Sequence, residues 1–144
     1  MAGTRDEVHL LLVGHSTGHV DVVKKNGAKD VILFTTEGCL EIARSLSKEL
    51  CDSGINVKDT CLLEPFSEDS VAVMTETISN MCDEISQAGH VPVIGLTGGT
   101  NLMVAAMCLV ATRKKLKCHY VCRSNDAMLH VDLAGAFESI GGLV

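Results

Sequence analysis

The chain has 144 residues, of which 47% are hydrophobic and 21% are charged. Its length suits a single domain that buries roughly two-thirds of its unfolded surface, and its composition excludes a disordered chain. The formal net charge of −6 argues against direct binding of duplex nucleic acid, which needs clustered Lys and Arg.

Strand-like and helix-like segments alternate along the chain. In order they are a strand at Val8–Val13, a helix at His19–Asn26, a strand at Val31–Thr35, a helix at Glu37–Cys51, a strand at Ile55–Leu63, a helix capped by Ser67 and stopped by Gly89, a strand at Val91–Leu96, a helix at Leu102–Thr112, and strands at Lys117–Cys122 and Met128–Leu133. This order predicts one α/β domain over residues 1–144. We expect a Rossmann-like three-layer sandwich whose mostly parallel sheet has helices on both faces, with a possible antiparallel edge pair at its C-terminal end.

Two segments carry more specific expectations. Val91–Leu96 is apolar throughout, which is typical of a strand in the middle of a parallel sheet. Leu102–Thr112 is apolar nearly all round, and such a helix must be covered on several sides, which points to a subunit interface. The tail from Gly135 onward shows no clear pattern.

The cysteines indicate the compartment. There are seven, an odd number without a C-x-x-C pair, and most lie in apolar runs, as reduced and buried thiols of cytosolic proteins do. Cys118, His119 and Cys122 have no second ligand pair with zinc-like spacing, so we expect no metal and no cofactor. No secretory leader and no apolar run near the ~20 residues of a membrane span are visible, so we expect a soluble, cytoplasmic protein.

The first candidate loop is Gly14-His15-Ser16-Thr17-Gly18, between the first strand and the first helix. In doubly wound sheets ligands bind beyond the carboxyl ends of the strands. Glycines allow close backbone approach there, and hydroxyls can donate to phosphate oxygens. His15 and His19 are four residues apart, so on a helix they would share a face, and either could contact a ligand. A loop that merely caps the helix is the alternative.

The same loop matches G-x-S-x-G, the nucleophile elbow of α/β-hydrolases, with Ser16 as nucleophile. A triad would also need an acid and a histidine further along, such as Asp126 and His130. Against this interpretation, the elbow normally follows several strands, and the hydrolase fold needs a longer chain. A Ser16-dependent hydrolase is therefore the remoter alternative.

The second candidate loop, Thr97-Gly98-Gly99-Thr100-Asn101, leads into the apolar helix. Two successive glycines at a helix N-terminus leave backbone N–H groups free to point at an anion, and two threonines add hydroxyl donors. The loop lacks both the G-x-G-x-x-G fingerprint and the lysine of a P-loop. Its chemistry predicts an anion or nucleotide loop, and a tight turn needed only for packing is the alternative.

The segment Gly95-Leu-Thr-Gly-Gly-Thr-Asn-Leu-Met-Val-Ala-Ala-Met107 resembles the Thr-Gly-Gly-Thr-Lys signature of CRISPR-associated Rossmann fold (CARF) domains. The resemblance extends over about residues 8–123 and includes Asp30-Val-Ile-Leu-Phe-Thr-Thr-Glu37 and the polar loop after the first strand. It departs at Asn101, where the family usually has Lys. Asn offers neutral hydrogen bonds where Lys would supply a point charge.

The resemblance implies a homodimer that binds a cyclic oligoadenylate, the second messenger of type III CRISPR antiviral signalling, across its two-fold axis. Carried over by position, residues Gly14 to Gly18 and Thr97 to Asn101 would line the pocket. We expect a sensor domain, with cyclic tetra-adenylate as its ligand. The enzymatic alternative is a standalone ring nuclease that cleaves the messenger without metal into linear products with 2′,3′-cyclic phosphate ends. In that case His15 or His19 would move protons, with Ser16 and Thr17 positioning the ring.

Overall fold

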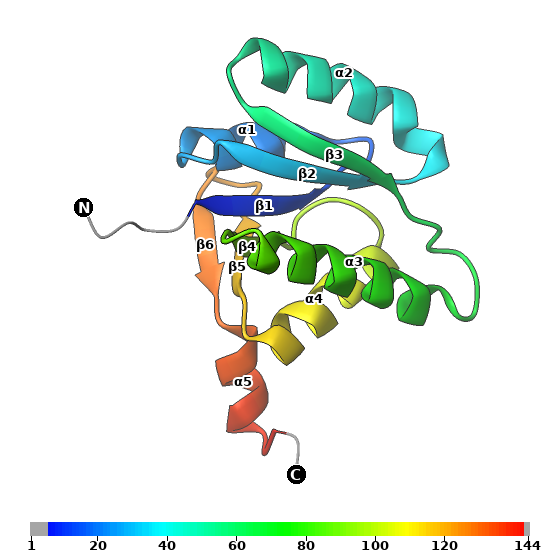
Figure 1. Ribbon diagram of the computed structural model, residues 1–144, viewed down its shortest axis with the longest axis vertical. Helices are drawn as coiled ribbons and strands as arrows, with labels where there is room; N and C mark the ends of the chain where they lie inside the picture. The colour runs from blue at the N-terminus through cyan, green and yellow to red at the C-terminus, as the bar shows by residue number, and fades with distance from the viewer. Residues whose placement is uncertain (1–5, 143–144) are drawn as a thin grey trace.

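The computed structural model describes residues 6–142 and has the layered α/β architecture that the sequence predicts (Figure 1). The strands are β1 (Glu7–Leu12), β2 (Asp30–Thr35), β3 (Asn56–Leu62), β4 (Val91–Gly95), β5 (Lys117–Val121) and β6 (Met128–Val131). The helices are α1 (Gly18–Lys25), the short 3-10 helix η1 (Glu37–Cys39), α2 (Leu40–Asp52), α3 (Ser70–Gln87), α4 (Asn101–Lys114) and α5 (Leu133–Ser139).

All six strands belong to one sheet, in the order β3-β2-β1-β4-β5-β6. The first five are parallel, and β6 runs antiparallel to β5 at the edge, which confirms the predicted edge pair. The apolar segment that became β4 lies inside the sheet between β1 and β5, as its composition predicts. Strand order reverses between β1 and β4, because the chain first builds outward through β2 and β3 and then returns to the other side of β1.

Alternate residues of the strands supply two separate cores, one on each face of the sheet. On one face α3 and α4 pack with Leu10 and Phe34 as central residues, and on the other α1 and α2 pack with Leu11 and Leu33. All four of these side chains are fully buried. Figure 1 shows the two helix pairs on opposite sides of the sheet and α5 projecting away from it. The three-layer sandwich is therefore confirmed.

The structure differs from the predicted elements at several helix starts. The helix predicted from Glu37 opens with the 3-10 helix η1 and is α-helical only from Leu40. The third long helix begins at Ser70, and Ser67 belongs to the preceding turn, where its hydroxyl donates to Asp69 at 2.9 Å. Asp132 ends β6 early because its carboxylate accepts the N–H of Gly135 at 2.8 Å and so caps α5. Helix α5 is a short element with no buried residue, which explains why periodicity did not indicate it.

No helix among residues 6–142 is long and apolar enough to cross a membrane.

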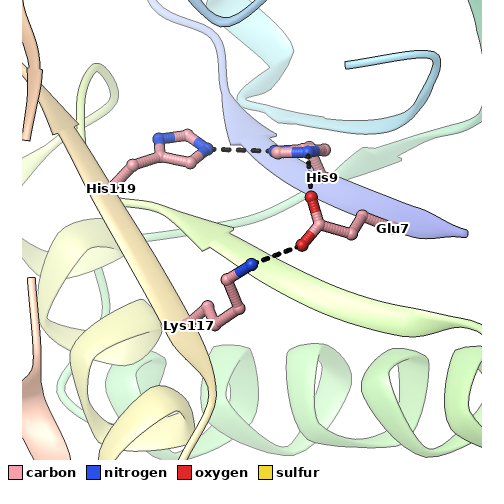
Figure 2. Close-up of polar contacts among 4 residues, drawn as sticks. All are labelled: Glu7, His9, Lys117 and His119. Carbon is pink, nitrogen blue, oxygen red and sulfur yellow. Dashed lines mark hydrogen bonds and ion pairs between the residues drawn. The ribbon is translucent and has the colours of Figure 1, made fainter. Parts of the chain in front are cut away.

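A row of polar side chains joins β1 to β5 across β4 (Figure 2). His9 Nδ1 lies 3.1 Å from His119 Nε2, and Lys117 Nζ donates to Glu7 Oε2 at 2.6 Å. His9 Nε2 lies 3.6 Å from the other oxygen of Glu7. The His119 ring has room because its neighbour on β4 is Gly95, where an added Cβ would lie 3.0 Å from His119 Cε1. Burial is the main cause that lowers the pKa of both histidines, that of His119 to about 4.

Because the pKa of His119 is lowered on folding, the unfolded chain binds more protons than the folded chain between pH 6.5 and about 4. We expect His119 to contribute stability above pH 6.5 that is lost as the pH falls toward 4, by on the order of 3 kcal/mol at most. The difference in unfolding free energy between the wild type and His119→Gln, measured by urea denaturation, should therefore shrink from pH 7.5 to 4.5. The exposed His130→Gln is the matched control and should keep the wild-type slope. An unchanged slope in His119→Gln would contradict this account.

Candidate functional site

The loops that follow β1 and β4 lie against each other at the point where strand order reverses. A Cβ added to Gly14 would lie 3.5 Å from the backbone nitrogen of Gly99, so the two loops pass in backbone contact. This contact follows from the parallel pairing of β1 with β4, which brings their carboxyl ends to one edge of the sheet. The structure therefore brings together the two glycine loops that the sequence singles out, at the place where open α/β sheets bind ligands.

Two buried side chains fix the start of the first loop. The hydroxyl of Thr35 donates to the carbonyl oxygen of Val13 at 2.9 Å. His19 Nε2 lies 2.7 Å from the carbonyl oxygen of Leu12, and since a carbonyl can only accept, Nε2 carries the proton. Burial lowers the pKa of His19, so this imidazole is neutral near pH 7.

The first loop presents His15, Ser16 and Gly18 to solvent, with Thr17 half-buried. The spacing of His15 and His19 does not place them on one helical face, because α1 begins only at Gly18 and His15 lies in the loop before it. His19 points inward, and His15 stays at the surface. The two predicted histidines thus have different surroundings.

The second loop requires its glycines. Gly98 and Gly99 have φ of +90° and +70°, in the left-handed region that favours glycine. A Cβ on Gly98 would lie 2.7 Å from both the His19 ring and the carbonyl oxygen of Leu12. His19, which holds the start of the first loop, therefore also packs against the second loop at Gly98.

Both threonines of the second loop have structural hydrogen bonds. Thr97 Oγ1 accepts the N–H of Val121 at 2.8 Å, which ties the loop to β5. Thr100 caps α4, and its Oγ1 accepts the N–H of Met103 at 3.2 Å. The hydroxyl hydrogens remain available as donors, as do the amides of Asn101 and Leu102, which have no intrahelical acceptor in the first turn of a helix. Asn101 is exposed at the start of α4.

A cavity of about 400 Å³ opens beside the two loops. His15 lines it from the first loop, and Gly99 and Thr100 line it from the second. Most of its other walls come from the segments that follow β2 and β3, at residues 36–39 and 64–66. Sequence reasoning missed these two segments as parts of the site, although both follow strands whose carboxyl ends reach the same edge.

The missed segments bring three kinds of side chain to the cavity. Glu37 and Glu64 add carboxylates, and Glu64 Oε1 accepts the N–H of Phe66 at 2.7 Å. Phe66 is 76% exposed. Cys39 lies with its Sγ 3.8 Å from His15 Nε2. Among residues 6–142, no Lys or Arg lines this cavity, so positive potential from this part of the chain must come from backbone amides and helix N-termini.

A second cavity, of about 510 Å³, lies at the opposite edge of the sheet, around Glu7, His9 and Lys117. It is larger, but it lies at the amino ends of the parallel strands, away from the two loops. Within residues 6–142 no group of three or more His, Cys, Asp or Glu could hold a metal ion. In the same described part of the chain, Ser16 has no hydrogen bond to a histidine side chain, so no observation favours the hydrolase.

Replacing Gly98 tests whether the two loops depend on each other. Gly98→Ala places a Cβ against His19 and the carbonyl of Leu12 at a positive φ, so we expect a loss of about 2 kcal/mol or more in unfolding free energy. Gly18→Ala is the control, because nothing lies within 4 Å of its added Cβ, and it should change stability by less than about 1 kcal/mol. Chemical denaturation measures both; equal stability of the two variants would contradict the packing described.

The sequence matches no protein-family model and none of the curated proteins. Solved structures with a similar fold are nevertheless found. Can2 from Sulfobacillus thermosulfidooxidans, in complex with cyclic tetra-adenylate, has a TM-score of 0.67 at 17% identity, over 88% of this chain and 35% of Can2. Enterococcus italicus Csm6, bound to cyclic hexa-2′-fluoro-hexa-dAMP, has a TM-score of 0.70 at 13% identity, over 95% of this chain and 43% of Csm6.

A type III CRISPR defence DNA nuclease that is activated by cyclic oligoadenylate has a TM-score of 0.70 at 19% identity. The similarity covers 90% of this chain and 20% of the nuclease. This chain thus spans less than half the length of each of these three proteins. At these identities the comparisons show the fold: this chain has a Rossmann-like α/β fold that is also present in these three proteins, one of which is a DNA nuclease of type III CRISPR defence.

Proposed function

We propose that this chain is a cytoplasmic sensor domain that binds a cyclic oligoadenylate, with cyclic tetra-adenylate as the preferred ring, in type III CRISPR antiviral signalling. The observation that carries the proposal is the contact between the two glycine loops at the switch point of the sheet. Similar folds in proteins described with cyclic oligoadenylates support it, and so does the resemblance of the Thr97–Asn101 loop to the CARF signature.

The phosphates of the ring bind at the loops. Backbone amides at Gly98, Gly99 and Asn101 face the anion, and hydroxyl groups of both loops donate to its oxygens. These hydroxyls belong to Ser16, Thr17, Thr97 and Thr100. The helix N-terminus of α4 supplies the favourable potential in place of the lysine that the family usually has.

The bases of the ring face the cavity. Glu37 and Glu64 would repel a phosphate, but a carboxylate accepts a hydrogen bond from the exocyclic amino group of adenine. Phe66 offers an exposed aromatic face at the same wall, on which a base can stack. Phosphates at the loops and adenines toward the acidic wall give each part of the ligand a complementary surface.

Two copies of the chain bind one ring. A cyclic tetra-adenylate has two-fold symmetry, which suits an isologous homodimer whose axis passes between the paired loops of the two subunits. Leu102 and Leu109 lie seven residues apart on α4 and are exposed, so they form an apolar strip next to the second loop. This strip is the proposed dimer contact.

Charge changes at residue 101 test the phosphate site. Asn101→Lys adds a cation beside the proposed phosphate and should tighten the binding of cyclic tetra-adenylate about tenfold, whereas Asn101→Asp should weaken it by at least as much. Isothermal titration calorimetry measures both constants.

The Asn101→Asp variant should keep the stability of the wild type, because an acidic residue in the first turn of a helix does not destabilise the helix. Its thermal unfolding midpoint should match that of the wild type, so a loss of binding would report on the ligand site. Equal affinities of the Lys and Asp variants would contradict a phosphate at this helix N-terminus.

The dimer contact is tested at Leu109, which is 53% exposed. Leu109→Glu should shift the mass measured by light scattering from twice 15.3 kDa toward the monomer. Leu62 on β3 has the same exposed fraction, so Leu62→Glu is the matched control and should leave the dimer intact. A wild-type monomer at micromolar concentration would contradict the shared site.

A ring nuclease is the second candidate, and the exposed imidazole of His15 at the cavity favours it. In such a reaction the ribose 2′-oxygen bonds to the adjacent phosphorus, and the bond to the 5′-oxygen breaks. His15 would take the 2′-OH proton, and the departing 5′-oxygen would gain one. Ser16 and Thr17 would position the phosphate, and His19 would hold the loop through its bond to Leu12.

Incubation with cyclic tetra-adenylate in a chelating buffer, followed by chromatography, tests this activity. If the chain is a ring nuclease, the products are linear with 2′,3′-cyclic phosphate ends, and His15→Ala should lower the rate by 100-fold or more, in line with general base catalysis of about 10²–10⁴-fold. His130→Ala, an exposed histidine on β6, should leave the rate unchanged. Tight binding with an intact ring would exclude the ring nuclease and leave the sensor as the function of this site.

A further inference from the structure

Cys39 and His15 meet at the wall of the cavity beside the loops. His15 follows β1 and Cys39 follows the neighbouring parallel strand β2, so the sheet brings them to the same edge. The distance from Cys39 Sγ to His15 Nε2 is 3.8 Å, within reach of a hydrogen bond to sulfur. Both residues line the cavity, although only 7% of Cys39 is exposed. At this distance the imidazole can accept the proton of the thiol when the sulfur attacks, which is the geometry of activated cysteine nucleophiles.

The position of Cys39 in the chain adds a second favourable influence. Cys39 ends η1 and is the N-cap residue of α2, and its side chain makes no capping hydrogen bond. The N-terminus of a helix stabilises a negative charge such as that of a thiolate. The sulfur of Cys39 therefore lies next to both a base and a helix N-terminus.

Other cysteines of the chain have the opposite surroundings. Burial raises the pKa of Cys82 to about 12 and those of Cys61 and Cys118 to about 11, and it also raises that of Cys108. Cys51 is exposed on α2, and no histidine contact is found for it in the described part of the chain. Cys51 is therefore the natural internal reference for a thiol whose reactivity reflects exposure alone.

We infer that Cys39 is a modification site for small, uncharged electrophiles, with His15 as its base. In the reaction His15 Nε2 takes the thiol proton, Sγ bonds to the electrophilic carbon, and the leaving group departs with the electrons of the broken bond. The imidazolium then returns the proton to water. Glu37 and Glu64 line the same cavity, so their carboxylates disfavour an anionic reagent.

Modification of Cys39 should weaken the binding of the cyclic oligoadenylate, an inference that rests on the proposed function. An adduct on Sγ would fill part of the cavity and separate His15 from its partner. Cyclic oligoadenylate would then lose the space for its base. The site would bind its ligand only while Cys39 is a free thiol.

The test is timed labelling with iodoacetamide at pH 7, with the rate at each cysteine read by peptide mass spectrometry. Cys39 should react faster than Cys51, and His15→Gln should slow Cys39 about tenfold while leaving Cys51 unchanged. Because His15 is exposed, this variant is expected to fold, and circular dichroism checks it. The ratio of iodoacetamide to iodoacetate rates should be larger at Cys39 than at Cys51. Faster labelling of Cys51, or a Cys39 rate indifferent to His15→Gln, would overturn the inference.

The consequence is tested separately by titrating cyclic tetra-adenylate into the protein before and after labelling, with Cys39→Ser treated with iodoacetamide as the control. Loss of binding only in the labelled wild type supports it. Equal binding by labelled and unlabelled protein overturns the consequence while leaving the proposed function intact. If the unlabelled protein does not bind the ring, both the proposed function and this consequence are overturned. The labelling rates would still show whether Cys39 is the more reactive thiol.

Discussion

The parallel pairing of β1 with β4 is the contact on which the rest of the candidate site depends. It brings two loops into backbone contact at Gly14 and Gly99, which are 85 residues apart in the chain. Neighbouring β2 and β3 then supply the remaining walls of the cavity. At position 98 only glycine fits, because an added Cβ would lie 2.7 Å from the His19 ring and from the carbonyl oxygen of Leu12. The chemistry of this edge is thus a consequence of strand order.

Burial separates the histidines of this chain into two roles. His9, His19 and His119 are buried, and burial lowers their pKa, so they serve as neutral hydrogen-bonding groups that join strands and support loops. His15 lies at the surface of the cavity next to the Cys39 thiol. The residue type is the same in every case, and the surroundings decide whether the imidazole joins parts of the fold or lies exposed at the cavity.

Much of the fold follows from patterns that are local in the sequence. Apolar runs alternating with helical periodicity predict the layers, and the uniformly apolar Val91–Leu96 predicts an interior strand. The two loops are recognisable because glycines and hydroxyls follow strands directly. The contacts of Cys39 with His15 and of His9 with His119 could not be predicted, because they depend on which strands are neighbours and in what register. The short helix α5 has no fully buried residue, so it leaves no clear periodic signal.

Hydrogen–deuterium exchange with and without cyclic tetra-adenylate tests the central claim most directly, because the two edges of the sheet have separate cavities. The account predicts slower amide exchange in residues 14–18 and 97–103 when the ring is added, with little change around Glu7 and Lys117 at the opposite edge. Protection at the opposite edge, or no protection anywhere at saturating ligand, would contradict a messenger site at the paired loops.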